Sequence, residues 1–85
     1  MTLKDAKDIF EEIAELCIKL EDNRLSDALQ SIYQDVEDAD SISDMIVLLG
    51  DLMFYVDEIS WSDQDIEEFK IEIQNLYNKF LDEAE

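Results

Sequence analysis

Residues 29–38, LQSIYQDVED, return in altered form as residues 73–82, IQNLYNKFLD, at a constant offset of 44 positions. Both stretches repeat apolar side chains every three or four residues, which is the spacing of one face of an α-helix. A fainter match at an offset of 36 links two sets of residues, Asp8, Ile13, Leu16 and Leu20 with Asp44, Leu49, Leu52 and Val56. Two copies of a helical hairpin, the second with a longer turn, would produce both offsets.

The apolar spacing predicts four amphipathic helices, at about residues 3–21, 25–38, 42–59 and 63–82. The chain has no Pro and a single Gly, so the usual signals of sheets and long loops are missing. Short connections favour antiparallel neighbours. We therefore expect one all-α domain over residues 1–85, an antiparallel four-helix bundle built from two similar helical hairpins.

Three helix starts carry a short hydroxyl side chain followed three residues later by Asp. The pairs are Thr2 with Asp5, Ser41 with Asp44, and Ser62 with Asp65. In such a pair the hydroxyl accepts from a free backbone N–H, and the acid lies at the positive end of the helix dipole. The second helix has only Asn23 or Ser26 as candidate caps, so its start is the least defined boundary.

The 45 positions from Leu25 to Phe69 contain 13 acids and no Lys or Arg, and they hold -13 of the net charge of -18. Helical surfaces normally mix both signs, because opposite charges four residues apart stabilise a helix by about 0.2 to 0.5 kcal/mol. This imbalance predicts a surface that binds a strongly basic partner. The alternative is that the acids only maintain solubility.

The bundle topology gathers acids at both of its ends, and all four predicted helices finish on acids, where the helix dipole disfavours them. The pattern works against stability and therefore favours a role in binding. The candidate partner-binding residues are Asp35, Glu37, Asp38, Asp40 and Asp44 at one end, and Asp57, Glu58, Asp63 and Asp65 around Trp61 at the other.

The third helix has apolar residues on two faces. One set can face the bundle, whereas Val47, Gly50 and Phe54 occupy another side. A helix that is apolar on both sides is buried on both sides. The second face predicts a homodimer interface or a hydrophobic partner groove, and close approach of another backbone would explain Gly50 in mid-helix.

The residues that carry most enzyme chemistry are missing. The chain has no His and no Gly-rich phosphate loop. The lone Cys17 lies on an apolar stripe and is expected to be structural. Asp38-Ala39-Asp40 begins like a calcium loop but lacks its turn Gly and closing Glu. We therefore predict no catalytic residue, no cofactor, no metal site and no enzyme activity.

One segment resembles another kind of protein. Residues 31–36, followed by Asp40-Ser41-Ile42, resemble the acyl carrier protein pattern, and Glu58-Ile59 lies about where that family has such a pair. The resemblance implies phosphopantetheine on Ser41. It covers roughly thirty residues, lacks the Gly before the motif and has an inserted residue there. The other interpretation of Ser41 is a helix cap.

These features predict a small acidic inhibitor that binds a basic protein. The inhibitor is an immunity-type or antitoxin-type protein that neutralises a nuclease toxin, or a nucleic-acid mimic that blocks a nucleic-acid-handling enzyme. In size and charge the chain is similar to acidic helical immunity proteins. The alternative from another class is a structural or adaptor bundle that acts through the third helix.

The composition also bears on location and on other partners. A lone Cys, a start unlike a secretion signal and a longest apolar run of twelve residues, 45–56, predict a cytoplasmic protein without a membrane span. The negative charge disfavours direct binding to nucleic acid or anionic lipid, because contacts with phosphate need Lys and Arg. The expected partners are therefore cationic proteins.

Overall fold

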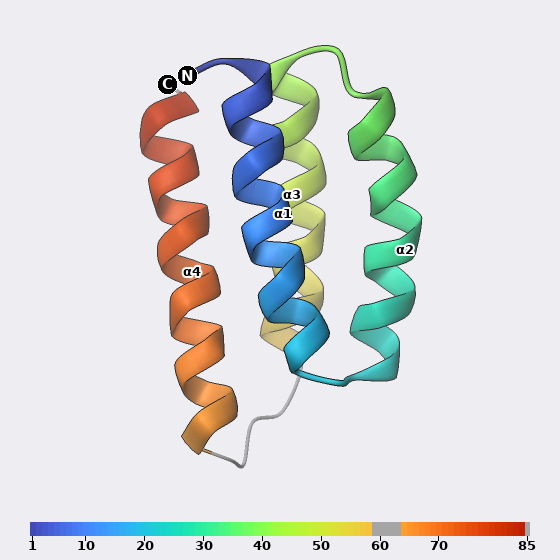
Figure 1. Cartoon of the computed structure of the whole chain (residues 1–85), viewed down its shortest axis with the longest axis vertical. Coiled ribbons are helices and arrows are strands. Elements are labelled where there is room, and N and C mark those ends of the chain that lie inside the picture. The colour runs from blue at the N-terminus through green and yellow to red at the C-terminus, as the bar shows by residue number, and fades with distance from the viewer. Residues whose placement is uncertain (59–63, 85) are drawn as a thin grey trace.

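The computed structural model describes residues 1–58 and 64–84, which form four α-helices joined by short connections (Figure 1). The helices are α1 (Leu3–Lys19), α2 (Asn23–Asp38), α3 (Ile42–Glu58) and α4 (Gln64–Ala84). Successive helices run in opposite directions, and both chain ends lie at the same end of the molecule as the connection between α2 and α3. The predicted all-α antiparallel bundle is confirmed.

Two of the three predicted caps lie within the described residues, and both form. Thr2 Oγ accepts from the backbone N–H of Asp5 at 3.2 Å, and the Asp5 carboxylate accepts from the backbone N–H of Thr2 at 3.3 Å. The hydrogen bond from the Thr2 backbone N–H to the Asp5 carboxylate, followed by hydrogen bonding from the Thr2 hydroxyl, lowers the pKa of Asp5. Ser41 Oγ accepts from the backbone N–H of Asp44 at 3.2 Å, whereas Ser62 lies outside the described residues.

The start of α2 corrects the sequence prediction. The cap is neither Asn23 nor Ser26 but Asp22, whose carboxylate accepts from the backbone N–H of Leu25 at 3.0 Å. Helix α1 stops at Lys19, and Glu21 takes a left-handed conformation with φ 54° in the turn. Asp22 therefore lies at the positive end of α2 and stabilises it, so only three of the four helices finish on acids as expected.

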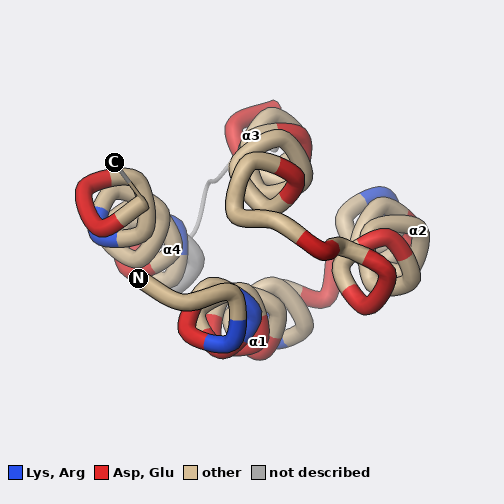
Figure 2. The backbone as a smooth tube through the Cα atoms, turned by 90° about the horizontal axis from the view of Figure 1, so that it is seen from above, with Lys and Arg blue, Asp and Glu red and all other residues tan. Residues whose placement is uncertain are grey.

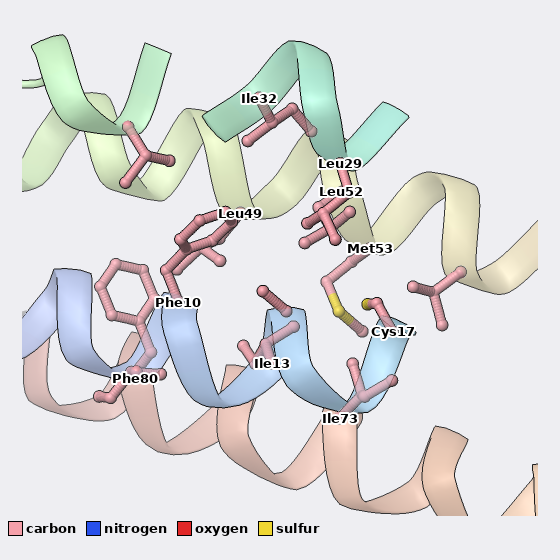
Figure 3. Close-up of a cluster of buried hydrophobic side chains, with 14 of the residues drawn as sticks. Phe10, Ile13, Cys17, Leu29, Ile32, Leu49, Leu52, Met53, Ile73 and Phe80 are labelled. Carbon is pink, nitrogen blue, oxygen red and sulfur yellow. The ribbon is translucent and has the colours of Figure 1, made fainter. Parts of the chain in front are cut away.

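The core lies between all four helices and consists of apolar side chains (Figure 3). Its largest fully buried members come from α1, α3 and α4, with Leu25 from α2, and they include Phe10, Ile13, Met45, Leu49, Leu52, Ile73 and Phe80. Among the described side chains, no polar or charged one is buried. Hydrophobic burial is therefore the main stabilising term. The described carboxylates lie at the surface and take no part in the core.

Cys17 belongs to this core. Its side chain is almost completely buried beside Met53 and Ile13 (Figure 3). Burial raises the pKa of the Cys17 thiol to about 12. Because only the thiolate is a good nucleophile, this thiol stays unreactive near neutral pH, as expected for a structural cysteine.

The sequence repeat appears in the packing as an approximate twofold relation. Helix α1 packs most extensively against α4, and α3 packs most extensively against α2. Exchanging α1 with α3 and α2 with α4 interchanges these two pairs. In the end-on view α1 and α3 face each other across the centre, while α2 and α4 lie at opposite sides (Figure 2). Within the described residues α1 and α3 are in contact across the centre, whereas α2 and α4 are not.

Candidate partner-binding groove

The positive charges are distributed unevenly over the bundle. From Asn23 to Glu58, which spans α2 and α3, there are nine acids and one cation, Arg24. The other five cations, all Lys, lie on α1 and α4 among acids (Figure 2). The α2 and α3 pair therefore forms one side of the molecule that is almost purely anionic, and the α1 and α4 pair forms a side of mixed charge.

The first predicted acidic cluster divides between two surfaces. Asp35, Asp38 and Asp44 line a hollow between α2 and α3. Glu37 instead lines a hollow between α1 and α2, and its backbone carbonyl accepts from Lys7 Nζ at 3.3 Å. Asp40 is exposed in the connection between α2 and α3. Three of the five acids thus share one surface.

The second predicted cluster is only partly described. Asp57 and Glu58 are exposed at the end of α3, but they face different neighbours. Asp57 accepts from Gln74 Nε2 of α4 at 3.4 Å, whereas Glu58 lines a small hollow beside Arg24 and Tyr55. Trp61 and Asp63 lie outside the described residues, as does the side chain of Asp65.

The second apolar face of α3 is exposed to solvent. Val47 and Phe54 each have 63% of their surface exposed, and they lie two helical turns apart on the same side. Gly50 is turned away from them toward α4, because a Cβ built on it would lie 3.5 Å from the Tyr77 hydroxyl oxygen. Gly50 therefore lies at the edge of this face that is nearer α4, whereas Val47 and Phe54 line the hollows beside α2.

Replacing Gly50 with alanine is expected to stabilise the free protein. The added methyl group would make an ordinary contact with the Tyr77 hydroxyl. Alanine in a helix interior is favoured over glycine by about 1 kcal/mol. Urea unfolding followed by circular dichroism should show a later midpoint for Gly50→Ala. A loss of stability that depends on protein concentration would instead support close packing of a second copy at Gly50.

A groove runs between α2 and α3 and consists of two separate hollows. Its lower part has a volume of about 640 Å³ and is lined by Arg24, Asp27, Ala28, Ser31, Ile32, Asp51, Phe54 and Tyr55. Its upper part has a volume of about 280 Å³ and is lined by Asp35, Asp38, Ala39, Asp44, Val47 and Leu48. The buried Ile32 and Ala39 form its base, and the carboxylates are exposed. We call the two parts together the α2–α3 groove.

The groove joins residues that the sequence predictions kept apart. The acids Asp35, Asp38 and Asp44 were assigned to one end of the bundle, and Val47 and Phe54 to an apolar interface. The predicted set of partner-binding residues did not include Asp27, Asp51 and Tyr55. The sequence did contain a signal for Asp51 and Tyr55. Val47, Asp51 and Tyr55 follow one another at intervals of four residues, and residues four apart on a helix are neighbours.

The twofold relation supplies an internal comparison, the matching groove between α1 and α4. The offsets 36 and 44 place Ile18 in the position of Phe54, Lys19 in that of Tyr55 and Lys79 in that of Asp35. Lys79 lines the upper part of the α1–α4 groove with Asp8, Glu12 and Glu83. Lys19 Nζ lies 5.9 Å from the centre of the Phe69 ring across the same pair of helices. Of these two grooves, the α2–α3 groove is the one without lysine among its described lining residues.

Ser41, the residue singled out by the carrier-protein resemblance, serves as the cap of α3. Residues 31–36 lie inside the continuous helix α2, where the carrier pattern has mostly loop. Within residues 1–58 and 64–84, no three side chains of His, Cys, Asp or Glu come together as metal ligands would.

Among the described residues, no helix combines the length and the apolar character needed to cross a membrane. Compared with known protein families, curated proteins and solved structures, the chain gives no significant match.

Proposed function

We propose that this protein is a small acidic inhibitor that binds a basic protein through the surface formed by α2 and α3. The partner is a nuclease toxin, neutralised in the manner of an immunity protein or antitoxin, or a nucleic-acid-handling enzyme blocked by mimicry. The observation that carries the proposal is the separation of charge, with nine acids and only Arg24 between Asn23 and Glu58.

The mechanism is electrostatic. Exposed carboxylates on stiff helices occupy the place of phosphates, and they accept charge-assisted hydrogen bonds from Lys and Arg side chains that would otherwise bind a nucleic acid. An anionic face also accelerates encounter with a cationic partner at low ionic strength. Aromatic side chains such as Phe54 and Tyr55 add the packed contacts that carry much of the affinity in protein interfaces.

The exposure of Val47 and Phe54 favours the second candidate, a structural or adaptor bundle. In that case the acids maintain solubility, and binding depends on apolar contacts that salt does not weaken. Salt dependence distinguishes the two functions, because exposed charges are screened within about 8 Å at physiological ionic strength.

Two variants with equal charge test the proposal. The groove-amide variant replaces four carboxylates of the α2–α3 groove, Asp27→Asn, Asp35→Asn, Asp38→Asn and Asp51→Asn. The outer-amide variant replaces four on α1 and α4, Asp8→Asn, Glu12→Gln, Glu15→Gln and Glu83→Gln. Each changes the net charge from -18 to -14. Both sets are exposed, so both variants should fold.

The immobilised wild-type protein should capture basic, nucleic-acid-binding proteins from an extract of its host at low salt and release them at high salt. Loss of several charge-assisted contacts is expected to weaken capture by the groove-amide variant at least about tenfold, or 1.4 kcal/mol. The outer-amide variant should retain capture within about twofold. Equal losses in both variants, or capture that ignores salt, would contradict the proposal and favour the adaptor.

A further inference from the structure

We infer that the α2–α3 groove holds a cationic amphipathic helix of the partner, with two large apolar side chains packed against Val47 and Phe54. This inference rests on the proposed function and makes it more specific, because it names the part of the basic partner that is bound. It requires apolar contact, opposite charge and a helical shape at the same place.

The apolar contact is supplied by side chains that the fold leaves largely exposed. Val47 and Phe54 are each 63% exposed, and Tyr55 is 43% exposed beside them. The Phe54 and Tyr55 rings are nearly perpendicular, with 6.3 Å between their centres, so the two aromatic side chains lie next to each other. Isolated exposed apolar residues are ordinary, but these line the same groove and can be covered by one occupant.

The charge of the groove selects the occupant. Asp27, Asp35 and Asp38 belong to α2, and Asp44 and Asp51 belong to α3, so carboxylates lie on both sides of the groove. Arg24 at the lower part is its one cation. An occupant needs apolar side chains toward the base and Lys or Arg toward both sides. A second copy of this chain would bring acids against acids, and like charges placed together are strongly disfavoured in interfaces.

The shape of the groove favours a helix. The α2 residues that line it run from Arg24 to Asp38, which is fifteen residues, about 21 Å, or about four turns of a helical occupant. An extended peptide binds by adding a strand to a free sheet edge. Here α2 and α3 use their backbone groups within the helices, so that an occupant meets side chains alone. A helix in an apolar groove is the binding mode that such a surface supports.

The probe for the test is a fluorescein-labelled peptide of Leu and Lys, about 18 residues long, with Leu at helical spacing along one face. Its control is a peptide of the same composition in scrambled order, which carries equal charge without an apolar face. Fluorescence anisotropy measures the dissociation constant of each peptide. The amphipathic peptide should bind the wild type at least tenfold more tightly than the scrambled peptide.

Matched variants locate the contact. Val47→Ala with Phe54→Ala removes the apolar contacts of the groove, and Ile18→Ala with Ile71→Ala removes two residues of similar exposure, 58% and 50%, on α1 and α4. The first pair should weaken amphipathic peptide binding at least tenfold, and the second pair less than twofold. In the labelled wild type, peptide addition should shift the amide NMR signals of residues 27–39 and 44–55 most.

The outcomes separate this inference from the proposed function. Binding that is steeply salt-dependent but equal for both peptides and both variant pairs would overturn the groove inference and leave the electrostatic inhibitor standing. Absence of binding by either peptide at low salt would overturn both. A wild-type dimer that excludes the peptide, and that Val47→Ala with Phe54→Ala dissociates, would overturn the inference in favour of a second copy.

Discussion

Phe80→Ala is expected to lower the free energy of unfolding by about 3 to 5 kcal/mol, because large-to-small changes in a packed core lose burial and leave a cavity. The Phe80 side chain is completely buried and comes from α4 into the same cluster as Phe10 (Figure 3). The whole free energy of unfolding of an 85-residue domain is roughly 4 to 13 kcal/mol. Urea unfolding followed by circular dichroism should therefore show a large shift of the midpoint, or a chain that no longer folds.

Phe54→Ala is the matched control, since it makes the same chemical change at an exposed site. With 63% of its surface in solvent, Phe54 contributes little to the core. Its replacement should change the free energy of unfolding by less than about 0.5 kcal/mol. Equal destabilisation by the two substitutions would mean that Phe54 is packed in the free protein, and that the α2–α3 groove is not open to a partner.

Raising the sodium chloride concentration from about 0.01 M to about 0.5 M should stabilise the protein by roughly 1 to 3 kcal/mol, because salt screens the repulsion between its carboxylates. At 0.01 M the screening length is about 30 Å, close to the 36 Å length of the molecule, so that charges repel across its whole length. At 0.5 M only close neighbours interact. Thermal unfolding at a series of salt concentrations measures this rise.

The groove-amide and outer-amide variants show where the repulsion arises. The α2 and α3 side has almost no compensating cations, so the groove-amide variant should be more stable than wild type at low salt and less sensitive to salt. The outer-amide variant loses acids that have lysines nearby, and its salt dependence should stay closer to that of the wild type. Stability that falls as salt is added would indicate that the surface charges attract one another on balance.

Most of the fold could be predicted from the sequence because apolar spacing is strong in these helices. Leu29, Ile32 and Val36 are buried as a stripe, and their repeat counterparts Ile73 and Phe80 are completely buried. The repeat also anticipated which helices correspond, and the structure shows that relation in its packing pairs. The apolar stripes and the repeat depend only on spacing within single helices, where residues three and four apart share a face.

Local competition explains the error at the start of α2. Asn23, Ser26 and Asp22 are all competent caps, and their order along the chain does not decide among them. The left-handed Glu21 ends the turn early enough for the Asp22 carboxylate to reach Leu25. A cap depends on the path of the preceding turn, which a helical pattern does not describe.

The α2–α3 groove could not be predicted because it depends on the angle of α3 about its own axis. Val47, Gly50 and Phe54 are close enough in direction to form one apolar face in sequence terms. Packing rotates α3 so that Gly50 faces Tyr77 of α4, while Val47 and Phe54 border α2. The position of the acids also depends on how each helix is turned. Glu37 and Asp38 are adjacent in the chain but line different hollows.

The approximate twofold relation means that the chain carries one scaffold twice, with different chemistry in each copy. Lys19 and Lys79 stand where the other copy has Tyr55 and Asp35. After a duplication, each copy of a hairpin can diverge while the shared core preserves the architecture. The grooves also differ at Glu11, which stands where the other copy has Val47, and at Ile71, which stands where it has Asp27. The two halves therefore present different chemistry on opposite sides of a single small bundle.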